Sequence, residues 1–132
     1  MKFLKQYLFT TAVFAGIDVV WIGWLMNDFY TKSYGDLARL VDGKFQAAIL
    51  PGILVYLVIP FGLVALAFPN TTTRRQAITK AALYGFATYG TYDLTNAAVL
   101  RNWSTTATIV DMLWGITLCS VVAAMTWRRS KV

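Results

Sequence analysis

The chain contains no histidine and no glutamate, and its only cysteine is Cys119. A lone cysteine cannot form a disulfide within the chain, so a disulfide framework and a redox cysteine pair are both excluded. The absence of histidine also excludes zinc sites built from Cys and His ligands and catalytic triads that need an imidazole base. We therefore expect no metal and no cofactor, and aspartate is the only acidic residue type left for acid–base chemistry.

Charged residues are scarce as well, at 14% of the sequence, whereas 58% of the residues are hydrophobic. Apolar runs occupy residues 7–26, 47–68, 77–100 and 105–127, and each is close to the ~20 residues that cross the bilayer core. The first run is too long for the hydrophobic part of a signal peptide, so we interpret it as a retained helix. The sequence predicts an all-α integral membrane protein: one transmembrane domain over residues 1–132, built as a four-transmembrane-helix bundle with an outer loop at residues 27–46.

The net charge of +6 comes from 12 basic and 6 acidic residues. Their distribution favours a membrane orientation over nucleic-acid binding, because in a four-span topology eight basic residues flank one side and four flank the other. The larger group is Lys2, Lys5, Arg74, Arg75, Lys80, Arg128, Arg129 and Lys131, and the smaller is Lys32, Arg39, Lys44 and Arg101. The positive-inside rule then predicts that both termini are cytoplasmic, with the lipid bilayer as a partner and no nucleic acid.

The predicted outer loop contains apolar residues near helical spacing, namely Leu37, Leu40, Val41 and Phe45. This spacing is typical of a short amphipathic helix that lies on the bilayer surface. The alternative is an ordinary loop that covers the end of the bundle.

Three aspartates, Asp18, Asp93 and Asp111, lie inside the apolar runs. An acid at the centre of a membrane helix costs roughly 3 kcal/mol on insertion scales, and such acids normally face a partner or a wet cavity and mark functional sites. The only nearby cation is Arg101, which is two turns from Asp93. Counted from the predicted outer ends of the runs, the three carboxylates share one layer in the outer half of the membrane.

Aromatic and amide side chains accompany each acid. Tyr89, Asp93 and Asn96 fall on one face of a helix, with Tyr92 alongside, and a tryptophan follows each of the other two acids by one turn. An indole N–H can donate to a carboxylate and can also form the wall of a pocket. The predicted ligand- or proton-binding residues are therefore Asp18, Asp93, Asp111, Asn96, Tyr89, Tyr92, Trp21 and Trp114, and the sequence indicates no catalytic residue.

Each acid also has a purely structural interpretation. Asp18 and Asp93 could form a buried polar clasp between helices. Asp111 could belong to a capping box, "TIVD", in which Thr108 is the N-cap of the last helix.

The stretches "DVVWIGW", "YGTYDLTNAAVLRNW" and "VDMLWG" resemble a family of small predicted membrane proteins, chiefly bacterial, classed as a domain of unknown function. The resemblance extends over nearly the whole chain, although the segment "NWSTT" lacks the proline that members often have after the tryptophan. It implies a four-helix protein of the bacterial inner membrane and does not imply an activity.

Three classes of function fit the acids. The first is a proton- or cation-linked carrier or amphiphile-binding protein, whose small size favours a homodimer. The second is a membrane enzyme that acts on a lipid with an aspartate as general acid or base. The third is a structural or accessory membrane subunit. We favour the first class, because acids without neighbouring bases suit a site that receives a cation or a proton.

Overall fold

The computed structural model describes residues 2–128, which form long helices joined by short connections and one two-stranded ribbon. In chain order the elements are α1 (Lys2–Val20), the π-helical segment Trp21–Leu25, α2 (Asn27–Tyr34), the 3-10 turn Gly35–Leu37, β1 (Leu40–Val41), β2 (Lys44–Phe45), α3 (Ile49–Gly62), the π-helical segment Leu63–Ala67, α4 (Arg74–Val99) and α5 (Thr105–Thr126). Arg129 and Lys131, which entered the charge count above, lie outside the described residues.

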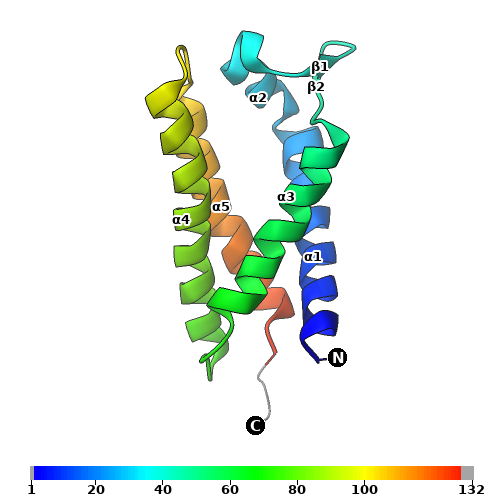
Figure 1. The fold of residues 1–132 in the computed structure, drawn as a ribbon, viewed down its shortest axis with the longest axis vertical. Coiled ribbons are helices and arrows are strands. Elements are labelled where there is room, and N and C mark those ends of the chain that lie inside the picture. Colours follow the sequence, from blue (N-terminus) through cyan, green and yellow to red (C-terminus); the bar gives the residue numbers. More distant parts are fainter. Residues whose placement is uncertain (1, 129–132) are drawn as a thin grey trace.

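The four long helices run along the long axis of the molecule (Figure 1). We call the end that bears α2 and the β1–β2 ribbon the loop end, and the N-terminus lies at the opposite end. The helices α4 and α5 lie side by side, α1 contacts both α5 and α3, and α4 contacts the π-helical segment that follows α3. Because that contact is at the end opposite the ribbon, α3 and α4 diverge toward the loop end (Figure 1).

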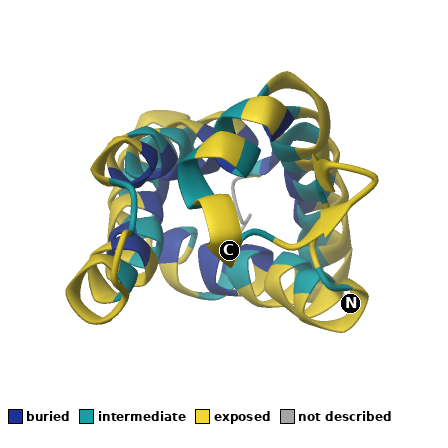
Figure 2. Ribbon diagram, turned by 90° about the horizontal axis from the view of Figure 1, so that it is seen from above, coloured by how far each residue is buried: buried dark blue, intermediate teal, exposed yellow. Residues whose placement is uncertain are grey.

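Three helical segments of residues 2–128 are long and apolar enough to cross a membrane: Lys2–Leu25, Ile49–Ala67 and Thr105–Thr126. Large hydrophobic side chains such as Trp24, Ile49 and Leu66 are more than 70% exposed on the outside of the bundle. Seen from the loop end, buried residues lie mainly on the inner sides of the helices (Figure 2). This is the distribution expected of a bundle whose outer surface contacts lipid, since lipid tails leave no reason to hide apolar side chains.

The helix starts follow from capping residues. The Thr73 side chain accepts a hydrogen bond from the backbone of Gln76 in a capping box, so α4 begins at Arg74, three residues before the predicted run. The Ser104 side chain accepts from the backbone N–H of Ala107, which makes Ser104 the N-cap of α5. The predicted capping role of Thr108 is therefore wrong: its hydroxyl lies inside the first turn and donates to the Ser104 carbonyl at 3.1 Å.

The predicted amphipathic helix of the outer loop is also wrong. Leu40 pairs with Phe45 and Val41 with Lys44 in an antiparallel ribbon. The two residues between the strands, Asp42 and Gly43, have positive φ angles of 51° and 75°, as a tight hairpin turn requires, and Asp-Gly is a favoured pair there. The turn thus overrides the apparent helical spacing, and the helix of this region is the earlier segment α2, which ends at Tyr34.

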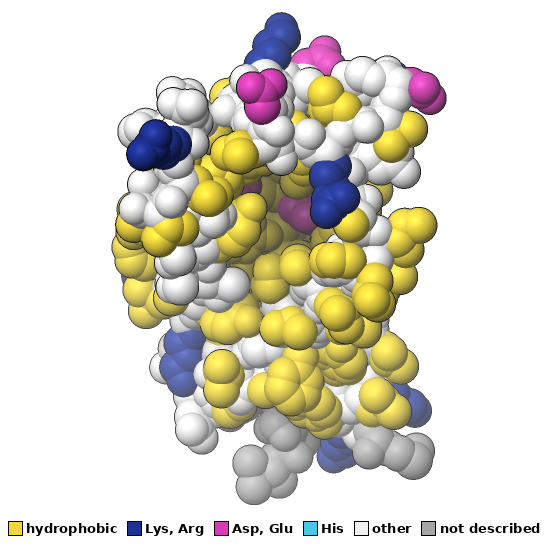
Figure 3. Space-filling view, turned by 45° about the horizontal axis from the view of Figure 1, so that its top comes forward, with side chains coloured by type: hydrophobic (Ala, Val, Ile, Leu, Met, Phe, Trp, Pro, Cys, Tyr) yellow, Lys and Arg dark blue, Asp and Glu magenta, His cyan; other side chains and the backbone are white. Residues whose placement is uncertain are grey.

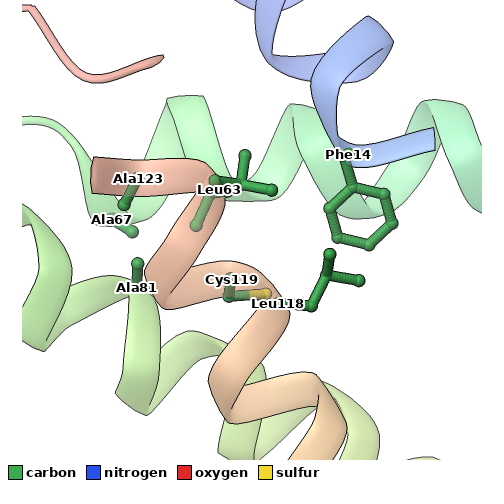
Figure 4. Packing of buried hydrophobic residues seen from close by; sticks show 8 residues of the cluster. Phe14, Leu63, Ala67, Ala81, Leu118, Cys119 and Ala123 are labelled. Atoms are coloured by element: carbon green, nitrogen blue, oxygen red, sulfur yellow. The ribbon is translucent and has the colours of Figure 1, made fainter. Parts of the chain in front are cut away.

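The core of the bundle depends on close approach between α4 and α5. A Cβ atom built on Gly85 would collide with the backbone carbonyl of Gly115, and one built on Gly115 would collide with the ring of Tyr89. The buried hydrophobic cluster next to this contact draws on α1, the π-helical segment Leu63–Ala67, α4 and α5 (Figure 4); it consists of Phe14, Leu63, Ala67, Ala81, Leu118, Cys119, Val122 and Ala123. This contact holds α4 against α5 below the three aspartates and so fixes the relative position of Asp93 and Asp111.

Candidate functional site

Asp18 is held by hydrogen bonds from two other helices. Its Oδ1 accepts from the indole Nε1 of Trp114 on α5 at 2.7 Å, and its Oδ2 accepts from the hydroxyl of Tyr56 on α3 at 3.0 Å. Both carboxylate oxygens thus have neutral donors, which satisfies the acid without a cation. The sequence places an indole one turn after Asp18 and one turn after Asp111, and in the structure Trp114 donates to Asp18 and not to its helical neighbour Asp111.

A pair of stacked indoles leads from Asp18 toward Asp111. The rings of Trp21 and Trp114 are parallel to within 6°, with centroids 4.0 Å apart. Trp21 Nε1 donates to the hydroxyl oxygen of Tyr30 at 3.3 Å, and the Tyr30 hydroxyl donates to Asp111 Oδ1 at 2.7 Å. An unbroken chain of contacts therefore joins two of the three acids.

Tyr30 belongs to the short helix α2 and is fully buried. Its burial, followed by the charge of Asp111, raises the pKa of the Tyr30 hydroxyl above its ordinary value. The hydroxyl therefore remains protonated and acts as the donor to Asp111. Through this bond, α2 is attached to the membrane-embedded part of the bundle.

Asp93 and Asp111 form a buried carboxyl pair across the α4–α5 contact. Asp93 is 0% exposed and Asp111 is 8% exposed. The two carboxyl groups are close enough for the charge of Asp111 to act on Asp93. Neither oxygen of Asp93 receives a hydrogen bond from a donor among residues 2–128. Among residues 2–128, Asp93 is therefore the one acid of the three whose carboxyl group receives no hydrogen bond.

The structure separates the remaining predicted residues into two groups. Tyr89 packs against Gly115 and the hydrophobic cluster, so it supports the helix contact without bonding to an acid. Tyr92 is 54% exposed, has Asn96 as a side-chain neighbour, and meets the ring of Trp103 edge-on with centroids 6.0 Å apart. Tyr92 thus lies at the surface directly before the buried Asp93, and the half-buried Asn96 follows Asp93 by one turn.

The surface above the acids is hollowed. Figure 3 shows a hollow near the loop end that is bordered by hydrophobic side chains, with acidic side chains visible inside it. Next to the loop end is a pocket of about 210 Å³, lined by Tyr34, Leu37, Arg39, Phe45, Gln46, Ala47, Tyr92 and Trp103. The acids are therefore approached from the side of the molecule that carries α2 and the ribbon.

Two site residues, Tyr30 and Tyr56, were not predicted from the sequence. Each donates a hydroxyl to an acid that is 38 or more positions away along the chain, so helical spacing could not reveal the pairing. The available signal was weaker: three acids in apolar runs need donors, and tyrosine is an abundant donor here, with seven in the chain. Within residues 2–128, no group of three or more Asp, Glu, Cys or His side chains has an arrangement that could hold a metal ion.

Comparison with known proteins gives one match. Residues 3–128 match a family described as "Predicted membrane protein (DUF2177)". Searches of curated proteins and of solved structures gave no match.

Proposed function

We propose a function for this chain from its own side chains, because it belongs to DUF2177, a family of predicted membrane proteins classed as a domain of unknown function. In this proposal the chain is a four-span protein of the bacterial inner membrane. It receives a proton or a cationic group at the Asp93–Asp111 pair, as a small proton- or cation-linked carrier or amphiphile-binding protein would.

The observation that supports this function is that Asp93 receives no hydrogen bond from any donor in the described part of the chain. Two carboxylates this close in a low-dielectric site repel each other strongly, and the donors to Asp18 and Asp111 are neutral side chains. A shared proton would turn the pair into a hydrogen-bonded carboxyl and carboxylate, and a bound cation would neutralise it. If Asp93 only held helices together, its carboxylate would be expected to accept hydrogen bonds from a neighbouring helix.

The surrounding contacts assign different roles to the three acids. Tyr30 fixes Asp111, while Trp114 and Tyr56 fix Asp18. Asp93 is thus the acid that can gain or lose a proton or a cation without breaking a hydrogen bond from a protein donor. We therefore assign proton or cation uptake to Asp93, with Asp111 as its oriented partner.

The first prediction concerns Asp93→Asn. The titratable groups around the pair are Tyr30 and Tyr34 of α2, Tyr92 of α4 and Asp18 of α1. A shared proton means that the folded chain binds one proton more than the unfolded chain near neutral pH, so stability should fall as pH rises. An alkylammonium ion should stabilise the wild type most at high pH, where the shared proton is absent. In Asp93→Asn the amide can donate to Asp111 permanently, so both the pH slope and the ammonium effect should disappear.

The measurement is the thermal midpoint of the detergent-solubilised protein across pH, with and without a short-chain alkylammonium salt. Asp28→Asn, in the exposed part of α2, is the matched control, and it should retain the wild-type profile. An Asp93→Asn variant that kept the wild-type pH dependence would show that another group titrates, and the carrier proposal would lose its main residue.

The second prediction concerns topology. The helix α4 has 26 residues, which corresponds to about 39 Å at 1.5 Å per residue, and it accompanies α5 as its antiparallel neighbour (Figure 1). We therefore expect α4 to cross the membrane although it is less apolar than the other three helices, and both termini to be cytoplasmic. Reporter fusions at the C-terminus and at the β1–β2 ribbon test this. A periplasmic C-terminus together with a periplasmic ribbon would mean that α4 does not cross, whereas a periplasmic C-terminus with a cytoplasmic ribbon would mean that the orientation is reversed.

A further inference from the structure

The pocket at the loop end is lined by aromatic rings, which attract cations, and by a basic side chain, which attracts anions. Three aromatic rings meet there: Tyr34 stacks on Trp103 with centroids 5.1 Å apart, and Tyr92 meets Trp103 edge-on. The ring centroid of Phe45 lies 6.0 Å from the ring centroid of Tyr34. Ring faces attract ammonium groups within about 6 Å, most strongly for tryptophan and tyrosine. One side of the pocket therefore favours a cationic group.

The acids below the pocket add to this preference. Burial, then the charge of Asp111, and further along Asp93 raise the pKa of the Tyr34 hydroxyl. Because Tyr34 lines the pocket, the negative field of the carboxyl pair is expected to act on a group bound there. An anion alone would be repelled by that field.

Arg39 supplies the opposite preference. It lines the same pocket and is itself exposed, and its guanidinium has the planar fork of donors that suits a phosphate. A cation alone would be repelled by this guanidinium. A ligand that carries both a phosphate and an amine can therefore interact favourably with both sides of the pocket.

The size and position of the pocket indicate which part of a ligand it can enclose. Its volume of about 210 Å³ is below the ~300–1,000 Å³ of pockets that enclose a whole drug-sized ligand. Beside it, the first turn of α3 exposes Ile49 and Leu50, which are 77% and 67% exposed. The pocket therefore fits a polar headgroup, while an attached chain would lie against apolar surface.

We propose that this pocket binds the zwitterionic phosphate–amine headgroup of an amphiphile, with Arg39 on the phosphate and the rings of Tyr34, Tyr92 and Trp103 around the amine. This inference rests on the proposed function, because it identifies the amphiphile that approaches the Asp93–Asp111 pair. The same headgroup chemistry occurs in a membrane phospholipid and in a free glycerophosphoamine.

The test measures thermal stabilisation of the full chain in a non-ionic detergent by four probes. They are a short-chain phosphatidylethanolamine, the phosphatidylglycerol with the same chains, an alkylamine, and free glycerophosphoethanolamine. We expect phosphatidylethanolamine to stabilise most. Arg39→Gln should weaken its apparent affinity by about tenfold, since a charge-assisted hydrogen bond is lost, and Tyr92→Leu should also weaken it. Arg101→Gln and Trp24→Leu, at positions that do not line the pocket, are the matched controls and should leave the affinity unchanged.

Equal stabilisation by phosphatidylglycerol would overturn the proposal in favour of a simple anion site, and stabilisation by the alkylamine alone would overturn it in favour of a cation site. A phosphatidylethanolamine effect that is the same in Arg39→Gln, Tyr92→Leu and the controls would place binding elsewhere. Free glycerophosphoethanolamine as potent as the lipid would support the pocket and assign its ligand to the aqueous phase. If no headgroup acts but Asp93→Asn still abolishes the pH slope, this inference fails while the proposed function stands.

Discussion

Gly85→Ala is expected to destabilise the folded chain by about 1–3 kcal/mol, the usual range for forcing an extra group into a packed interface. The added Cβ would collide with the Gly115 carbonyl, and a backbone carbonyl cannot rotate away as the end of a flexible side chain can. The helices α4 and α5 would have to separate near Asp93 and Asp111. The midpoint of thermal unfolding in detergent measures the effect.

Gly16→Ala is the matched control. Gly16 also lies within a helix, but a Cβ there has nothing within 4 Å. Alanine is favoured over glycine in a helix interior by roughly 1 kcal/mol, so this variant should be neutral or slightly stabilising. The two identical substitutions are thus expected to have opposite signs. If both variants raised stability, the tight α4–α5 contact would not exist in the folded protein.

Asp18→Leu is expected to destabilise the chain by about 2–4 kcal/mol, because it leaves two partly buried donors without an acceptor. The indole N–H of Trp114 and the hydroxyl of Tyr56 both point to this carboxylate. Leucine fills similar space and suits lipid, so a loss of stability would come from the donors and not from a cavity. The free energy of unfolding in a denaturing detergent titration reports it.

Asp18→Asn provides the control for this prediction. The amide oxygen can accept from Trp114, and the amide nitrogen can donate to the Tyr56 hydroxyl oxygen, which can act as an acceptor. The contacts among α1, α3 and α5 are then retained, and we expect most of the stability to return. Equal losses for the leucine and asparagine variants would instead show that the negative charge of Asp18 is what matters.

The long helices could be predicted from the sequence because apolar runs of about 20 residues have few other outcomes. The connection between α1 and α3 could not, because two local signals competed there. Leu37, Leu40, Val41 and Phe45 have helical spacing, whereas Asp42 and Gly43 favour a hairpin. The turn dominates because positive φ angles at two successive residues cannot occur within a helix.

The site was predictable only in part, for a related reason. The acids stand out because each is costly in an apolar run, and the structure places all three in one connected region. Their partners do not stand out, because a tyrosine within a helix has many possible roles. The pairing of Trp114 with Asp18, from helices far apart in the chain, depends on how the helices pack and not on spacing within either helix.

The stacked pair Trp21 and Trp114 gives the site an optical property of its own. Parallel indole rings with centroids 4.0 Å apart couple their electronic transitions, and the coupled pair absorbs circularly polarised near-ultraviolet light differently from two isolated rings. The signal arises between the π-helical segment Trp21–Leu25 and α5, at the point where the Asp18 and Asp111 networks meet. A proton or ligand that binds at the acids and moves either indole ring should therefore change this signal. The near-ultraviolet circular dichroism of the unlabelled protein reports such binding.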